Sequence, residues 1–129
     1  DASSNGGSPL PVELTSFTAS ALESSVLLNW ETATEVNNYG FEIERQQSAI
    51  SDQPSPWETL GFVPGNGNSN SPKKYSFVDD LSDVIADSLE YRLKQIDTDG
   101  KFEYFGSRAK VDLSTITEVM EELIPIKYS

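Results

Sequence analysis

The sequence of 129 residues contains no cysteine and no histidine. The absence of cysteine excludes disulfide bonds, a thiolate nucleophile and cysteine-ligated metal sites. The absence of histidine removes the imidazole base on which Ser–His–Asp and Cys–His nucleophilic centres depend. We therefore expect a protein that is not an enzyme, with no catalytic residue, no bound cofactor and no metal.

Basic residues are also scarce, since 9 Lys and Arg face 21 Asp and Glu, giving a formal net charge of −12. Phosphate recognition needs clustered Lys and Arg, so nucleic acid is excluded as a partner. An anionic membrane surface is disfavoured for the same reason. Long apolar runs are absent as well, and without a run of about 18 apolar residues we expect no membrane insertion.

The length and the distribution of Gly and Ser predict one domain with an extension at each end. Residues 1–9 are rich in Gly and Ser and are predicted to form a flexible linker. Residues 10–113 carry the strand-like patterns and form the predicted domain, and residues 114–129 form a C-terminal extension.

The C-terminal extension has two alternative interpretations. Residues 115–118 fit a helix capping box, and apolar residues follow at helical spacing until Pro125, which favours a short helix. Residues 123–128 are alternatively a short apolar strand.

Two segments at the centre of the chain alternate strictly between apolar and charged residues. The charged positions of residues 39–45 are mainly acidic, and those of residues 89–95 are mainly basic. Because side chains alternate across a strand, each segment has one apolar and one charged face. Opposite charges on neighbouring strands attract modestly, so we expect the two strands to be neighbours. The charged residues concerned are Glu42, Glu44, Arg92 and Lys94.

Other strands are predicted on both sides of this pair, with Trp30 as the largest contributor to the core. They cover residues 12–20 (with a bulge near Thr15 and Ser16), 26–32, 57–63, 73–79 and 101–113 (with a bulge at Gly106). Predicted connections are the loops at residues 35–38, 46–56 and 64–72, a connection at 80–88 that holds one helical turn, and a hairpin turn at 97–100. About seven short strands separated by turns are typical of an all-β, antiparallel sandwich.

With these residues placed, the segment 10–113 resembles a fibronectin type III domain, a seven-stranded immunoglobulin-like sandwich. The resemblance rests on Trp30, on residues 39–45 and on residues 89–91. It implies that Tyr91 is the corner tyrosine, whose hydroxyl bonds to nearby backbone.

Three stretches, residues 10–17, 28–45 and 91–100, are similar to a narrower family. It is a module of secreted Bacteroidota- or Ignavibacteria-type proteins that commonly precedes a C-terminal type IX secretion sorting domain. The resemblance implies a non-catalytic structural or interaction module at the cell surface or outside the cell. Its partners would be neighbouring domains of a parent chain or other copies of itself.

Paired carboxylates are the remaining route to catalysis, because two of them can act as acid and base in glycosidases. Glu42 and Glu44 are the best-placed pair, but Arg92 and Lys94 balance them on a solvated strand face. We therefore favour a structural role for these carboxylates.

Two acidic stretches are candidates for calcium. Residues 97–100 resemble the start of a calcium loop, but the twelfth position is Arg108 where a glutamate is required, so a turn is favoured. A second acidic group is interpreted as surface or capping residues, and it comprises Asp79, Asp80 and Asp83.

Two surfaces are candidates for binding. Tyr39, Trp57, Tyr104 and Phe105 would form a platform for carbohydrate if several were exposed in a row. Residues 10–14 and 123–128 would instead reach a neighbouring copy and pair with its sheet edge, as in an extracellular filament. The filament subunit and the carbohydrate-binding module are thus alternatives to the structural module.

Overall fold

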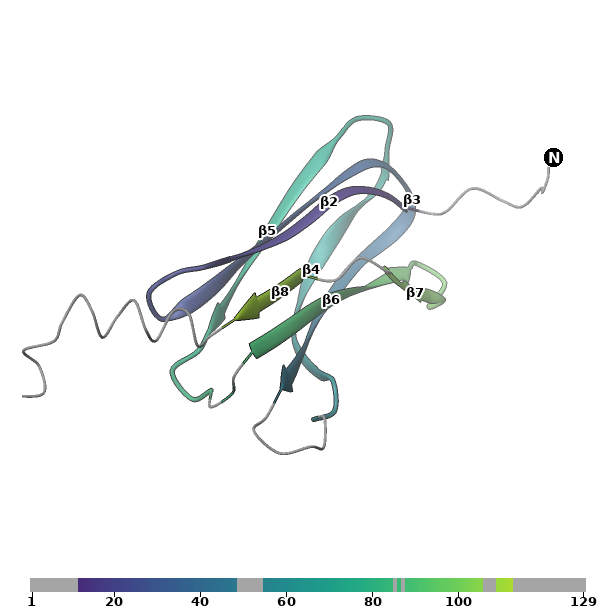
Figure 1. The fold of residues 1–129 in the computed structure, drawn as a ribbon. Coiled ribbons are helices and arrows are strands. Elements are labelled where there is room, and N and C mark those ends of the chain that lie inside the picture. Colours follow the sequence, from purple (N-terminus) through teal and green to yellow (C-terminus); the bar gives the residue numbers. More distant parts are fainter. Residues whose placement is uncertain (1–11, 49–54, 85, 87, 106–108, 113–129) are drawn as a thin grey trace, which may run out of the picture.

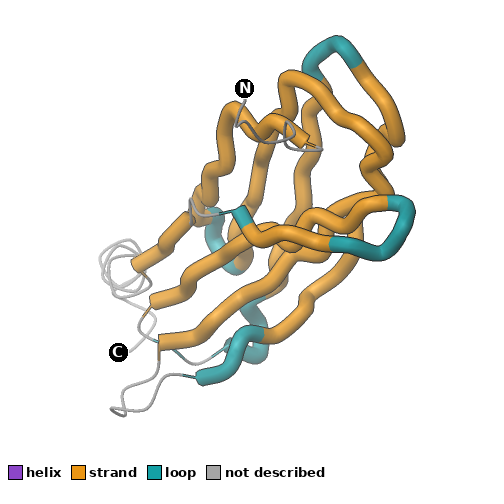
Figure 2. The backbone as a smooth tube through the Cα atoms, turned by 90° about the vertical axis from the view of Figure 1, so that its right-hand side faces the viewer, coloured by secondary structure: helices purple, strands orange, loops and turns teal. Residues whose placement is uncertain are grey.

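The computed structural model describes residues 12–48, 55–84, 86, 88–105 and 109–112. Within these residues the fold is all-β, and every strand pairing is antiparallel. Figure 2 shows the strands running along the length of the molecule, with the described loops at their ends. The strands are β2 (Val12–Ala21), β3 (Ser25–Ser48), β4 (Glu58–Ser69), β5 (Lys73–Asp80), β6 (Ser88–Asp97), β7 (Phe102–Tyr104) and β8 (Ala109–Asp112).

Strand β3 organises the sheet because it pairs with four other strands. Its first half pairs with β2 and β5, and its second half pairs with β4 and β6. Strand β6 also pairs with β7 and β8. Between its two halves β3 bends, as Figure 1 shows. Asn37, with a φ of 52°, and the register shifts on either side of Asn38 mark the bend.

The bend curls the sheet so that side chains from both halves of β3 meet in one core. Trp30 from the first half contacts Phe41 from the second edge to face, with ring centroids 5.5 Å apart. Trp30 also stacks on Tyr75 of β5 at 5.7 Å. The prediction that Trp30 lies in the core is confirmed. The fully or nearly buried apolar residues are Val12, Val26, Leu28, Trp30, Phe41, Ile43, Leu89, Tyr91, Leu93 and Val111.

The predicted pairing of the two alternating segments is confirmed. Glu42 lies opposite Lys94, and Glu44 lies opposite Arg92. Both pairs form ion pairs, at 3.7 Å and 2.7 Å respectively. The strands near residues 12–20 and 73–79 are also present, and the predicted bulge near Thr15 appears as a register shift between β2 and β3.

Three predicted loops are wrong, in whole or in part, because their backbone pairs with a strand. The loop at residues 35–38 and the first three residues of the loop at 46–56 lie within β3, and residues 64–69 continue β4 beyond the predicted end at Val63. Glycine and asparagine disfavour strands but do not prevent backbone pairing, as Gly67 opposite Asn38 illustrates. The predicted single strand at 101–113 consists, in its described part, of the separate strands β7 and β8.

The hairpin turn at residues 97–100 is confirmed. The amide of Gly100 donates to the carbonyl of Asp97 at 2.9 Å, and Gly100 has the positive φ of 93° that such a turn requires. The described part of the connection at 80–88 contains a turn, closed by a bond from the Val84 amide to the Leu81 carbonyl, where we expected a helical turn.

Some predictions lie outside the described residues. They concern the linker at 1–9, the bulge at Gly106 and the extension at 114–129 with its helix or strand. In the part of the chain that is described, no helix is long and apolar enough to cross a membrane.

Candidate functional site

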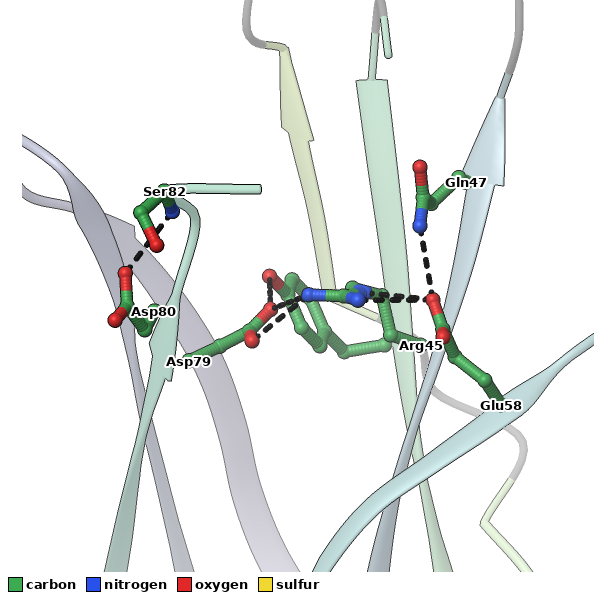
Figure 3. A network of polar contacts seen from close by, with 7 residues as sticks. Arg45, Gln47, Glu58, Asp79, Asp80 and Ser82 are labelled. Atoms are coloured by element: carbon green, nitrogen blue, oxygen red, sulfur yellow. Dashed lines mark hydrogen bonds and ion pairs between the residues drawn. The ribbon is translucent and has the colours of Figure 1, made fainter. Parts of the chain in front are cut away.

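Two buried charges, Arg45 and Asp79, meet at one end of the core, together with side chains from two further strands (Figure 3). Arg45 of β3 donates through one terminal nitrogen, Nη1, to both carboxylate oxygens of Asp79 on β5, each at 2.8 Å. The other side of its guanidinium donates to Glu58 Oε1 at 2.9 and 3.0 Å. The hydroxyl of Tyr91 on β6 donates to Asp79 Oδ2 at 2.6 Å. We call these four residues the Arg45 cluster.

The hydrogen bonds of the Arg45 cluster shift the pKa values of Arg45, Tyr91 and Glu58 in the direction that preserves the pairing. Burial opposes the charge of Arg45, but its bonds to Asp79 and Glu58 outweigh burial and raise its pKa. Burial and the neighbouring Asp79 carboxylate raise the pKa of Tyr91. A bond from Gln47 and the guanidinium of Arg45 lower the pKa of Glu58 against the effect of burial. The cluster is therefore an anchor between strands, in which Arg45 and Tyr91 keep their protons.

Two sequence predictions about this cluster are wrong. Asp79 was expected on the surface, but only 5% of it is exposed, because its position in β5 points inward after Tyr75 and Phe77. Tyr91 was expected to bond to nearby backbone, but its hydroxyl bonds to the Asp79 side chain. Asp80 and Asp83 are exposed as expected, and Asp80 accepts a hydrogen bond from the Ser82 amide in a capping arrangement.

A second polar cluster surrounds Glu35, which is only 1% exposed. Its carboxylate accepts hydrogen bonds from Thr32 Oγ1 at 2.8 Å, from Asn38 Nδ2 at 2.9 Å and from the backbone amide of Asn66 at 3.0 Å. The hydroxyl of Tyr75 donates a fourth bond. No ion pair to Glu35 is found among the described residues. The carboxylate is held entirely by neutral donors.

These donors fix the protonation state of both partners. Burial alone would raise the pKa of Glu35, but the bonds from Tyr75, Asn38, Asn66 and Thr32 together lower it. Burial, followed by the bond to Glu35, raises the pKa of Tyr75 to about 12. A carboxylate stabilised in its ionised form is a weak base, so the arrangement serves structure.

The outer face of the sheet carries a different set of side chains. Phe62 of β4, Glu42 of β3, Lys94 of β6 and Tyr104 of β7 are consecutive partners in one row across the sheet. Directly opposed residues share a face, so this row places an aromatic ring at each end and an ion pair in its middle. Gly40 makes room for the Phe62 ring, because a Cβ there would lie 2.3 Å from Phe62 Cζ.

More aromatic rings extend both ends of this row. Tyr39 contacts Phe62 with ring centroids 5.1 Å apart, and Phe102 contacts Tyr104 at 5.7 Å. We call these four residues the aromatic face. All of them are well exposed, at 57% for Tyr39, 52% for Phe102, 44% for Tyr104 and 40% for Phe62.

The cationic side chains of Arg92 and Lys94 contact several of the aromatic rings. The Arg92 guanidinium lies 3.9 Å from the centroid of Tyr104 and 4.2 Å from that of Trp57. Lys94 Nζ lies 4.1 Å from the centroid of Phe102. Since Arg92 also bonds to Glu44 at 2.7 Å, it is fixed on three sides and holds the rings in place.

The predicted aromatic platform is partly reproduced. Tyr39 and Tyr104 lie on the aromatic face, and Trp57 joins it through Arg92. Phe105 does not, because it packs against the core. Phe62 and Phe102 were missed, although their alternation with Gly61 and Glu103 placed them on strand faces.

The remaining candidate groups have structural partners. Glu44 is buried and paired with Arg92, so it is shielded where we expected a solvated face, and Asp97 accepts a hydrogen bond from Gln95 at 2.9 Å. Among the residues that the structure describes, no three acidic side chains are grouped to hold a metal ion. A shallow hollow on the other half of the sheet has Glu31 beside Lys74, which are opposed in the β3–β5 ladder.

Neither a protein-family model nor a curated protein sequence matches the chain.

Proposed function

We propose that this chain is a non-catalytic structural or interaction module of a bacterial secreted or cell-surface protein, built on a fibronectin type III-like sandwich. The bend in β3 supports the fold. It divides the neighbours of β3 along its length, with β2 and β5 beside its first half and β4, β6, β7 and β8 on the side of its second half. This distribution is compatible with the two sheets of an immunoglobulin-like sandwich.

The observation that supports a non-catalytic role most strongly is the contrast between the buried carboxylates and the exposed aromatic residues. Inside, the Glu35 carboxylate accepts four hydrogen bonds and the Asp79 carboxylate is bonded to Arg45 and Tyr91, so both carboxylates hold strands together. Outside, the aromatic face is exposed on a sheet of paired strands. A rigid scaffold with an exposed aromatic surface favours binding over catalysis.

Two measurements test this proposal. Fractionation of the source bacterium, with an antibody against the chain, is expected to detect it at the cell surface or in the medium, and a purely cytoplasmic signal would overturn the location. Incubation of the purified chain with polysaccharide, peptide and ester substrates is expected to give no turnover. Turnover above a heat-denatured control would overturn the non-catalytic role.

The filament alternative stays a prediction. It depends on residues 10–14 and 123–128, of which only residues 12–14 are described, and these pair with β3 of the same chain. Sedimentation of the purified chain over a range of concentrations tests it, because a filament subunit forms large species where a module stays monomeric.

A further inference from the structure

We propose that the aromatic face binds an uncharged polysaccharide, lying across β4, β3, β6 and β7. This inference rests on the proposed function, since it names the ligand class of a non-catalytic module. The ligand is a chain of several sugar units. Phe62 and Tyr104 stand on strands three spacings apart, which is about 14 Å, too far for one sugar ring to contact both.

The order of side chains across the face favours a glycan over a protein. Protein interfaces concentrate their aromatic residues at the centre and place charges at the rim. Here the order is reversed, because the ion pairs Glu42–Lys94 and Glu44–Arg92 occupy the centre and the rings flank them. Sugar units present apolar C–H faces for stacking on rings and hydroxyls for bonding to charged groups. An extended sugar chain therefore matches both parts of the face.

The charges of the protein favour an uncharged polysaccharide as the ligand. The centre of the face carries two acidic and two basic side chains, all paired, so it is locally neutral. The whole chain has a net charge of −12, which repels an acidic polysaccharide and opposes association of two copies through this face. A neutral polysaccharide is not repelled by this net charge.

The rings are held ready for stacking before a ligand arrives. Arg92 lies against Tyr104, Lys94 lies against Phe102, and the Phe62 ring covers Gly40. Side chains fixed in advance lose little conformational freedom on binding, which raises affinity. Each of these cations is a positioning residue, because it acts through the ring it supports.

The test uses the full chain and a panel of polysaccharides. Retention on insoluble cellulose and chitin, and retardation in gels containing xylan or mannan, measure binding to neutral chains, with polygalacturonate as the acidic contrast. We expect at least one neutral polysaccharide to bind and polygalacturonate not to bind. Failure of every neutral polysaccharide overturns this inference but leaves the non-catalytic module intact, whereas release of reducing sugar overturns the module itself.

Two double variants locate the site. Tyr39→Ala with Phe62→Ala removes one edge of the face, and Phe102→Ala with Tyr104→Ala removes the other. Each is expected to weaken binding about tenfold or more, because two stacking rings are lost. The matched control is Val78→Ala, which removes an exposed apolar side chain on the outer face of β5 and is expected to leave binding unchanged. Equal binding by all three variants overturns the site.

A measurement on the unaltered chain keeps the inference testable if a double variant does not fold. Amide resonances of β4, β6 and β7 are expected to shift on addition of the bound oligosaccharide, while those of β2 and β5 stay in place. Shifts confined to β2 and β5 overturn the assignment. Concentration-dependent dimerisation that moves the same β4, β6 and β7 resonances without any sugar also overturns it, because the face is then an interface between copies.

Discussion

The hydroxyl of Tyr91 donates a 2.6 Å hydrogen bond to Asp79 Oδ2, the same oxygen that pairs with Arg45. Tyr91 and Asp79 lie on β6 and β5, which pair with different halves of β3 and not with each other among the described strands. Arg45 joins the second half of β3 to the same carboxylate. One buried carboxylate therefore links the two halves of the curled sheet.

Replacing Asp79 by alanine leaves Arg45 buried with only Glu58 as an ionic partner. We expect a loss of about 3–5 kcal/mol in the free energy of unfolding, because Arg45 loses its buried counter-charge and keeps only the partly exposed Glu58 carboxylate. Urea unfolding measures the loss. The control is Asp80→Ala at the exposed neighbouring position, with an expected loss below about 1 kcal/mol. Equal losses in both variants would contradict the burial of Asp79.

Removing the whole ionic group is expected to cost much less than removing one partner. The triple variant Arg45→Met, Asp79→Leu, Tyr91→Phe leaves no buried charge without its partner among these three residues. Apolar replacement of a buried ion pair is often neutral or stabilising, so we expect recovery of most of the stability that Asp79→Ala loses. A triple variant less stable than Asp79→Ala would show that the site does not accept apolar packing.

The partner of the Tyr91 hydroxyl can be identified by a double-mutant cycle. Tyr91→Phe alone is expected to cost about 1.5–3 kcal/mol, because it removes a bond to a charged acceptor. In the Asp79→Ala background the same change should cost much less, giving a coupling energy of about 0.5–3 kcal/mol. Additive losses would instead indicate a backbone acceptor, as the fibronectin-like resemblance implied.

The strands were predictable where side-chain alternation is strong and the interaction is between neighbours. Glu42 and Lys94 carry opposite charge at matching positions of two alternating segments, and they pair as expected. The hairpin at residues 97–100 followed from the preference of glycine for a positive φ. The strand pairing and the hairpin turn both depend on properties of individual residues that can be read from the sequence.

The buried polar groups were not predictable in this way. Arg45 and Asp79 are separated by 34 positions, and their pairing depends on how the two halves of the sheet stack. Alternation alone does place Arg45 on the same face as Phe41 and Ile43, a signal that points to a buried cation in need of a partner. Glu35 gave no such signal, because two of its four donors, Asn66 and Tyr75, come from β4 and β5.

Acid is expected to destabilise the protein through Glu35. Its pKa lies below the ordinary 4.5 in the folded state, so its contribution is present above pH 4.5 and is lost as pH falls through the folded value. Glu58, with a lowered pKa, adds to the effect in the same direction. Unfolding by urea at a series of pH values below 4.5 measures the decline.

Glu35→Gln isolates the buried carboxylate. We expect the variant to be less stable at neutral pH, because its amide cannot accept all four bonds, and to show a shallower decline in acid. Glu13→Gln, at an exposed position of β2, is the control and should follow the unaltered protein. Identical acid profiles for Glu35→Gln and the unaltered protein would rule out Glu35 as the source.

Alkali is expected to destabilise the protein through Tyr75, whose folded-state pKa is raised from 10.0 to about 12. A raised pKa gives stability that is complete below pH 10 and is lost as pH rises toward 12, because the unfolded chain releases its proton first. Tyr91, whose pKa is also raised, acts in the same direction.

The variant Tyr75→Phe should therefore be less stable than the unaltered protein at neutral pH, because it has lost a donor to Glu35. Between pH 10 and 12 it should lose less further stability than the unaltered protein. Tyrosinate absorbance, followed alongside unfolding, checks this, and a full tyrosinate signal at pH 10 to 11 in the folded protein would contradict the hydrogen bond from Tyr75 to Glu35.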